Sequence, residues 1–144
     1  MRIAGLLLVS LISGVALAQT IEVQNPWVSW LPTTTTAAYF TLVNQGDRPV
    51  RLLEVLCPLA KETMLMITTQ TPETVNGQQE MALGMQMVPY FLIPPHGRLV
   101  LAPGGNHVML MGLRSPLKLG ERVKLILIFS DGSRMTIEAP VRRE

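Results

Sequence analysis

The sequence predicts an all-β fold, and three of its features lead to that prediction. Short runs of β-branched, aliphatic and aromatic residues recur along the chain. Turn-forming sequences such as Asn-Gly, Asp-Gly and Pro-Gly-Gly separate these runs at fairly even spacing. No stretch combines a 3.6-residue apolar period with helix-capping residues. Many short strands separated in this way are typical of a β-sandwich or a Greek-key β-barrel.

The first 18 residues are predicted to be a secretory signal peptide. Arg2 is followed by an apolar run, and the region ends at Ala16-Leu17-Ala18, which has the form of an Ala-x-Ala cleavage site. We therefore expect a periplasmic or otherwise exported protein that is cleaved after Ala18. An uncleaved anchor is the alternative, although the apolar run is short for a membrane span. Residues 19–144 should then form a single β domain with no further membrane span.

Five strands are expected in the first half of this domain. They cover residues 21–23, 27–30, 37–43, 49–56 and 61–69. The turn-forming Gln24-Asn25-Pro26 should separate the first two strands. The run 49–56 is expected to pair back onto 37–43 as its hairpin partner.

The second half contains further runs with strand character. They cover residues 81–87, 91–93, 98–101, 107–111, 123–129 and 134–139. The dipeptide Asn76-Gly77 predicts a tight turn before the first of them, and Asp131-Gly132 should join the last two. Residues 81–87 would also suit a helical turn, and we expect them to be extended.

Charge, cysteine content and motifs exclude several classes of function. The net charge is +2 and the charged residues are scattered, so no nucleic-acid-binding surface is expected. The single cysteine, Cys57, rules out an intrachain disulfide; its apolar neighbours favour a buried thiol, with a copper ligand or an intermolecular bridge as alternatives. No nucleophile–base set, phosphate loop or zinc-type spacing is present, which argues against an enzyme.

Methionine is concentrated in one region of the chain. Seven of the eight methionines after the initiator lie between residues 64 and 111, namely Met64, Met66, Met81, Met85, Met87, Met109 and Met111. Core filling would account for two or three of them. Exported proteins are exposed to methionine oxidation, so the remaining thioethers indicate another role.

The strand after Pro103-Gly104-Gly105 carries the first candidate metal ligands. Side chains two residues apart on a strand point to the same face, so His107, Met109 and Met111 should share one face. An imidazole beside thioethers is a soft donor set that suits Cu(I). An isolated His-x-Met is more often a core methionine with a loop histidine, so the interpretation depends on the other methionines.

The block Pro-Gly-Gly-x-His-x-Met-Leu-Met at residues 103–111 resembles that of the periplasmic copper chaperones called PCuAC. The similarity extends from Trp27 to residue 129 and so covers nearly the whole mature chain. It implies a cupredoxin-like Greek-key β-barrel that binds Cu(I) at an exposed edge. It also implies delivery of copper to an exported acceptor, such as cytochrome c oxidase subunit II or its assembly factors.

The resemblance also implies a ligand set. The family's His-x-Met maps onto His107 and Met109, and the family spacing places a further ligand at Met85, with Met87 as the alternative. The family's first histidine falls on Met66. This chain would therefore have three thioethers and one imidazole, which still suits Cu(I).

Two departures from the family pattern keep a second function open. The first histidine is missing, and residues 70–79 form an apparent insertion. A metal-free β-sandwich interaction or assembly module with a methionine-rich contact edge is therefore the alternative. Outside the proposed site, His96 is expected in a solvated turn, and Met81 and Met135 are expected to be packing residues.

Overall fold

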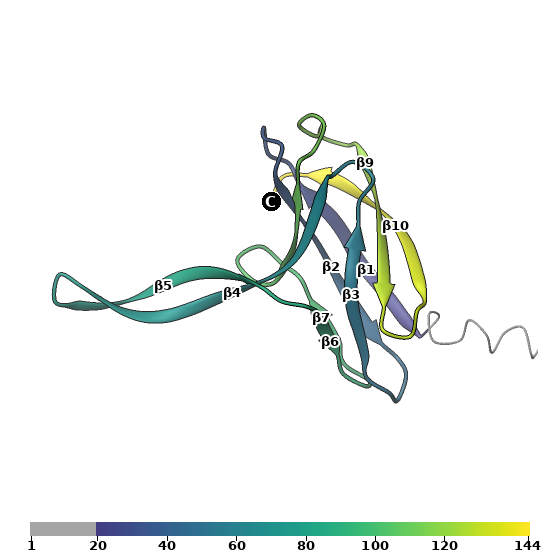
Figure 1. The fold of residues 1–144 in the computed structure, drawn as a ribbon, viewed down its shortest axis with the longest axis horizontal. Coiled ribbons are helices and arrows are strands. Elements are labelled where there is room, and N and C mark those ends of the chain that lie inside the picture. Colours follow the sequence, from purple (N-terminus) through teal and green to yellow (C-terminus); the bar gives the residue numbers. More distant parts are fainter. Residues whose placement is uncertain (1–19) are drawn as a thin grey trace, which may run out of the picture.

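The computed structural model describes residues 20–144, apart from the side chains of residues 70, 71, 82 and 83, and is all-β within that range (Figure 1). Its ten strands are β1 (Ile21–Ser29), β2 (Thr36–Asn44), β3 (Val50–Leu56), β4 (Glu62–Val75), β5 (Gln78–Met87), β6 (Phe91–Ile93), β7 (Arg98–Val100), β8 (His107–Met111), β9 (Arg122–Phe129) and β10 (Arg134–Arg142). The predicted all-β fold is confirmed. The predicted signal segment lies outside the described residues.

The strands form two groups that enclose a common core. One group has the order β5-β4-β8-β2-β1, with β7 also paired to β2, and the other has the order β10-β9-β3-β6. The parallel pair β1–β10 joins the two groups. Many neighbouring strands, such as β4 and β8 or β9 and β3, are therefore not consecutive in sequence, as expected for Greek-key connections.

The core follows from the two-residue period of the strands. On β9, Val123, Leu125, Leu127 and Phe129 point inward and are buried, while Arg122 and Lys124 are exposed. On β8, Val108 and Leu110 are buried in the same core. Each fully buried aliphatic or aromatic side chain stabilises the fold by about 1.5–3 kcal/mol, and this core fixes which face of β8 is turned outward.

β1 is one continuous strand, so the prediction of two strands separated by a turn was wrong. Its pairing with β2 changes register between Gln24 and Trp27, and Asn25 has a φ of 50°. Asparagine tolerates this left-handed conformation better than most residues. The turn-forming residues therefore produce a β-bulge within the strand rather than a reversal of the chain.

β3 does not pair with β2, so the predicted hairpin was also wrong. β3 instead pairs with β9 and β6 in the other group of strands. The buried Asn44 side chain holds the chain where it crosses between the groups: its amide donates to the carbonyls of Arg48 (2.7 Å) and Ile93 (3.2 Å). Its Oδ1 accepts a hydrogen bond from the Gly46 amide at 2.9 Å.

β4 and β5 form a long hairpin whose outer part extends away from the barrel (Figure 1). β8 pairs with β4 only from Glu62 to Met66, so farther along β4 the only partner is β5. The predicted turn is confirmed, with φ values of 53° at Asn76 and 80° at Gly77. We call residues 69–84 the arm; the apparent insertion at residues 70–79 forms its outer part, and β4 is longer than the predicted strand.

Candidate metal site

The pairing of β4, β5 and β8 brings the thioethers and the imidazole to one surface of the sheet. Directly opposite residues on paired strands lie on the same face. The register places Met66 opposite both His107 and Met87, Met64 opposite Met109, and Thr68 opposite Met85. Since Val108 and Leu110 point into the core, this shared face is the outer one. The predicted alternation along β8 is therefore confirmed.

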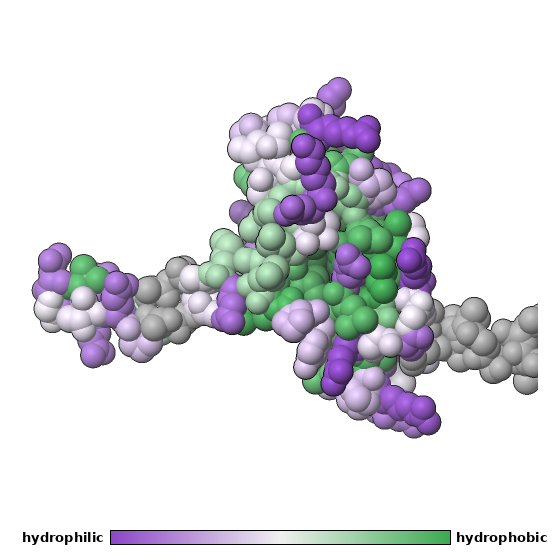
Figure 2. All heavy atoms as spheres, in the orientation of Figure 1, coloured by the Kyte–Doolittle hydropathy of each residue, from purple (hydrophilic) through white to green (hydrophobic). Residues whose placement is uncertain are grey.

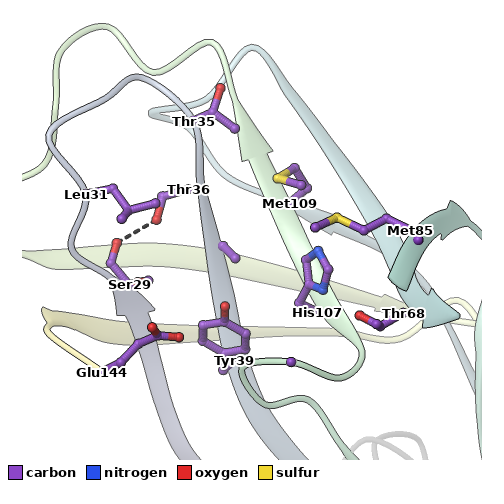
Figure 3. Close-up of a pocket in the computed structure, with 13 residues that line it drawn as sticks. Ser29, Leu31, Thr35, Thr36, Tyr39, Thr68, Met85, His107, Met109 and Glu144 are labelled. Atoms are coloured by element: carbon purple, nitrogen blue, oxygen red, sulfur yellow. Dashed lines mark hydrogen bonds between the residues drawn. The ribbon is translucent and has the colours of Figure 1, made fainter. Parts of the chain in front are cut away.

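Three of the predicted ligands line one cavity of about 490 Å³: Met85 from β5, and His107 and Met109 from β8. Figure 3 shows Met85 and Met109 extending toward the same end of the His107 ring. Only 6% of His107 is exposed, whereas 63% of Met85 is exposed. The cavity thus combines a buried imidazole with a thioether that is open to solvent.

The turn before β8 fixes the orientation of the His107 ring. Nδ1 of His107 lies 3.0 Å from the carbonyl oxygen of Gly105. A carbonyl only accepts hydrogen bonds, so Nδ1 is the donor, and in the neutral ring Nε2 is then the nitrogen with the free lone pair. Thr68 Oγ1 donates to the same carbonyl oxygen at 2.8 Å. Such a hydrogen bond to the far ring nitrogen is the usual way in which a protein orients a histidine ligand.

The Pro-Gly-Gly turn places this carbonyl. Gly104 has a φ of 80°, a conformation that favours glycine, and the Gly105 amide donates to the Ala102 carbonyl at 2.9 Å. The Ala102 amide donates to the Asn106 carbonyl at 3.0 Å, which closes the loop at the start of β8. The turn that marks this motif in the sequence therefore orients His107.

The opposite wall of the cavity comes from β1, β2 and the last residue of the chain. The Tyr39 ring lies 6.5 Å from the His107 ring, between centroids, and Glu144 also lines the cavity. Burial raises the pKa of Tyr39 and the Glu144 carboxylate raises it further, so the phenol stays neutral at physiological pH. Thr36 Oγ1 donates to the Ser29 carbonyl at 2.6 Å and ties β2 to β1 beside the cavity (Figure 3).

The donor set in the described part of the chain is soft. No group of three or more His, Cys, Asp or Glu side chains converges there in a way that could hold a metal ion. Zinc sites in proteins are usually built from such groups, so the candidate ligands on this face are thioether sulfurs together with the His107 imidazole.

The two candidate ligands on β5, Met85 and Met87, line different hollows. Met85 lines the cavity with His107, whereas Met87 lines a second hollow together with Met64 and Cys57. Met66 lines neither hollow, although it stands opposite both His107 and Met87 in the sheet. The family spacing placed the ligand at Met85 and kept Met87 as the alternative, because residues two apart on a strand share a face.

The other histidine and methionines gave mixed outcomes. His96 is exposed and Met135 packs against the core, as expected. Met81 is 56% exposed on the arm, so the prediction that it is a packing residue was wrong. The insertion carries Met81 beyond the barrel, where there is no core to pack against. Thr68 and Tyr39 were missed as cavity residues, although Thr68 follows Met66 at the two-residue spacing of the same face.

Solved structures of copper-binding domains have this fold. DR1885 from Deinococcus radiodurans, described in its Cu(I) form, is 40% identical with a TM-score of 0.67, and the match covers 88% of this chain and 83% of that one. Its apo form gives 41% identity and a TM-score of 0.64, over 87% of this chain and 80% of that one. The copper-bound PCuAC domain from PmoF2 shares the fold at 24% identity, with a TM-score of 0.67 over 87% and 94% of the two chains. The fold is thus that of a PCuAC domain, and the resemblance seen in the sequence is confirmed.

Relatives in sequence identify the family. Residues 21–141 match the family described as "Putative lipoprotein LpqE-like". The "Putative lipoprotein Lxx21020" of Leifsonia xyli subsp. xyli is 34% identical over 125 residues, which are 87% of this chain and 71% of that protein. The chain therefore belongs to the LpqE-like family.

Proposed function

We propose that this protein is a copper carrier that binds one Cu(I) ion in the cavity lined by Met85, His107 and Met109. The observation that carries the proposal is that these three side chains, from two strands far apart in sequence, line the same cavity. Thioether sulfur and imidazole nitrogen form a set that selects Cu(I) over hard cations. The Cu(I) form described for DR1885 adds support from a relative that is 40% identical.

Met66 is the proposed fourth ligand. It stands directly opposite His107 on β4 and belongs to the same outer face. Methionine has three flexible side-chain bonds, so a change of rotamer can move its sulfur while the backbone stays in place. Met87, the other candidate, lines the neighbouring hollow, which favours Met85 as the ligand from β5.

The proposed mechanism is ligand exchange rather than catalysis. Thioethers are neutral, so copper can leave them without a proton transfer. Met85 is the exposed member of the set, and an acceptor's ligand can replace it first while His107 still holds the ion. The Gly105 carbonyl keeps the imidazole oriented during this exchange.

We propose that the protein acts outside the cytoplasm, after removal of residues 1–18. Its family and its Leifsonia relative are described as lipoproteins, which supports export. Within residues 20–144 there is no helix of the length and apolarity that a membrane crossing requires. The proposed recipient is an exported copper protein, and cytochrome c oxidase subunit II and its assembly factors are candidates.

A Cu(I) titration against a competing chelator tests the binding proposal. The double variant His107→Ala/Met109→Leu should lose one equivalent of bound Cu(I) relative to wild type. Met81→Leu is the matched control, because it removes an exposed thioether on the arm that lies outside the cavity. Leucine conserves the methionine volume, so the fold should persist. The proposal fails if the wild type binds no Cu(I), or if the double variant binds as many equivalents as the wild type.

A metal-free contact module is the second candidate function. Met85 and Met87 are both more than half exposed at the root of the arm, and Figure 2 shows moderately hydrophobic surface (pale green) where the arm leaves the barrel. Exposed methionines adapt to varied binding partners. This function takes precedence if the wild-type protein binds no Cu(I) in the same titration.

A further inference from the structure

A second hollow lies beside the methionine-bearing face, where the end of β3 meets the start of β4. It has a volume of about 570 Å³ and its lining includes three sulfur-bearing side chains, Cys57, Met64 and Met87. None of these residues lines the cavity with His107. We call this space the seam hollow.

Backbone contacts fix the walls of the seam hollow. Thr63 Oγ1 donates to the Val55 carbonyl and so attaches β4 to β3. The Val88 amide donates to the Leu65 carbonyl at 2.9 Å, which holds the end of β5 beside β4 next to Met87. Because the strands on both sides are tied together, the three sulfur-bearing residues stay at the same hollow.

Cys57 is a buried free cysteine at the start of a tight turn. The Ala60 amide donates to the Cys57 carbonyl at 3.0 Å, which closes the turn. Burial raises the pKa of the Cys57 thiol, and hydrogen bonds from the amides of Leu59 and Ala60 counter part of that rise.

The two methionines of the seam hollow are not explained by core packing. Met64 is half-buried and Met87 is 62% exposed. A hydrophobic residue that only filled the core would be expected on the inner face, as Leu65 is between Met64 and Met66. The exposed Glu54 and Glu62 also line the hollow, where their carboxylates attract a cation and offset the charge of Lys61.

We infer that the seam hollow is a second Cu(I) site, with Cys57, Met64 and Met87 as its ligands. Binding replaces the S–H bond of Cys57 with a Cu–S bond and releases one proton to solvent, and copper stays in the +1 state throughout. Thiolate and thioether together form a set selective for Cu(I). One thiolate and one Cu(I) ion make a neutral pair, which a buried position tolerates better than a free thiolate.

The two sites would adjoin each other through Met66. This residue stands opposite His107 on one side and opposite Met87 on the other. Met66 therefore neighbours one proposed ligand of each site in the sheet. The arrangement assigns the protein a capacity of two Cu(I) ions at adjoining sites.

Counting bound Cu(I) in matched variants tests the second site independently of the first. Titration against a competing chelator without oxygen should give two equivalents for the wild type. Cys57→Ala should bind one, and His107→Ala/Met109→Leu should also bind one. The variant combining all three substitutions should bind none. If bound Cu(I) is lost only in the His107→Ala/Met109→Leu variant and not in Cys57→Ala, the proposed function stands and the second site is overturned.

Two further measurements distinguish a site with three sulfur ligands from copper binding by the Cys57 thiol without the methionines. Met64→Leu/Met87→Leu should weaken binding of the Cys57-dependent equivalent at least tenfold, whereas Met81→Leu should leave it unchanged. The Cys57-dependent equivalent should also release one proton and protect Cys57 from alkylation by iodoacetamide. Unchanged binding in the Met64/Met87 variant would overturn the three-ligand site. Because Met87 is exposed, the single variant Met87→Leu gives the same test with little risk to folding.

Discussion

A single backbone carbonyl controls the imidazole on which the proposed site depends. The Gly105 oxygen accepts hydrogen bonds from Nδ1 of His107 and from Oγ1 of Thr68. The first bond leaves Nε2 available to a metal, and the second attaches the loop before β8 to β4. The sequence predicted His107 and Met109 on one face because that depends only on the two-residue period. It missed Thr68 because the contact joins residues 37 positions apart.

Replacing Thr68 with valine should weaken Cu(I) binding at the His107 cavity about tenfold, within the range typical of residues that orient a ligand. The loss of one hydrogen bond should lower the free energy of unfolding by about 0.5–1.5 kcal/mol. Chelator competition and urea unfolding measure the two effects. Thr69→Val is the matched control, because Thr69 is the next residue on β4 and lies on its opposite face. Equal affinities for the two variants would show that Thr68 does not position His107.

At the scale of elements, the arm is the feature that sets this chain apart from a plain barrel. Its strands pair only with each other, and Glu73 stands directly opposite Glu80 near the turn. Like charges at opposed positions destabilise a hairpin, and a two-stranded ribbon in water has marginal stability. Figure 2 shows mainly hydrophilic surface at the end of the arm, so its outer part adds little buried apolar area.

The position of the arm could be predicted, but its shape and the pairing of β3 could not. Asn76-Gly77 marks the turn locally, and the run of polar residues marks an insertion. How far β4 and β5 extend could not be predicted, because the outer part of the arm has no core and depends only on the pairing of these two strands. The partners of β3 are distant in sequence, as is the Ile93 carbonyl, 49 residues away, that the Asn44 side chain contacts where the chain crosses between the groups. From sequence, the simplest expectation is a local hairpin between β2 and β3. Only packing of the core favours the crossover that pairs β3 with β6 and β9 instead.

Shortening the arm should leave the barrel and the copper cavity intact. Deleting residues 71–75 and 78–82 keeps Asn76-Gly77 as the turn and joins it to the next paired positions, 70 and 83. We expect the free energy of unfolding to change by less than about 1 kcal/mol, since exposed segments contribute little to stability. Cu(I) affinity at the His107 cavity should be unchanged, because Met85 and Thr68 are retained.

Urea unfolding and the Cu(I) titration check both expectations for the shortened protein. A loss of several kcal/mol would show that the arm is part of the cooperative core. A loss of copper binding with normal stability would show instead that the outer arm holds Met85 in place.

At the scale of the whole molecule, the barrel is a rigid support for an outer face that carries seven soft donors. The inner residues of β8 are packed in the core, which fixes His107, Met109 and Met111, while the β4–β5 hairpin adds Met64, Met66, Met85 and Met87. Composition alone indicated that so many methionines in one region were not core filling. It could not divide them between two hollows, because that depends on where β4 crosses both β8 and the end of β3 in space.

The most direct test of Cu(I) binding in the His107 cavity is methyl NMR of protein labelled with ¹³C at the methionine ε-methyl groups. Cu(I) is added to the Cys57→Ala variant, so that the seam hollow does not compete for the ion. Addition of one equivalent should shift the Met85 and Met109 methyl resonances, which Met→Leu variants assign, and should leave that of Met81 unchanged. If the Met85 and Met109 resonances stay in place, or if Met81 shifts as much as they do, then the cavity around His107 does not hold copper.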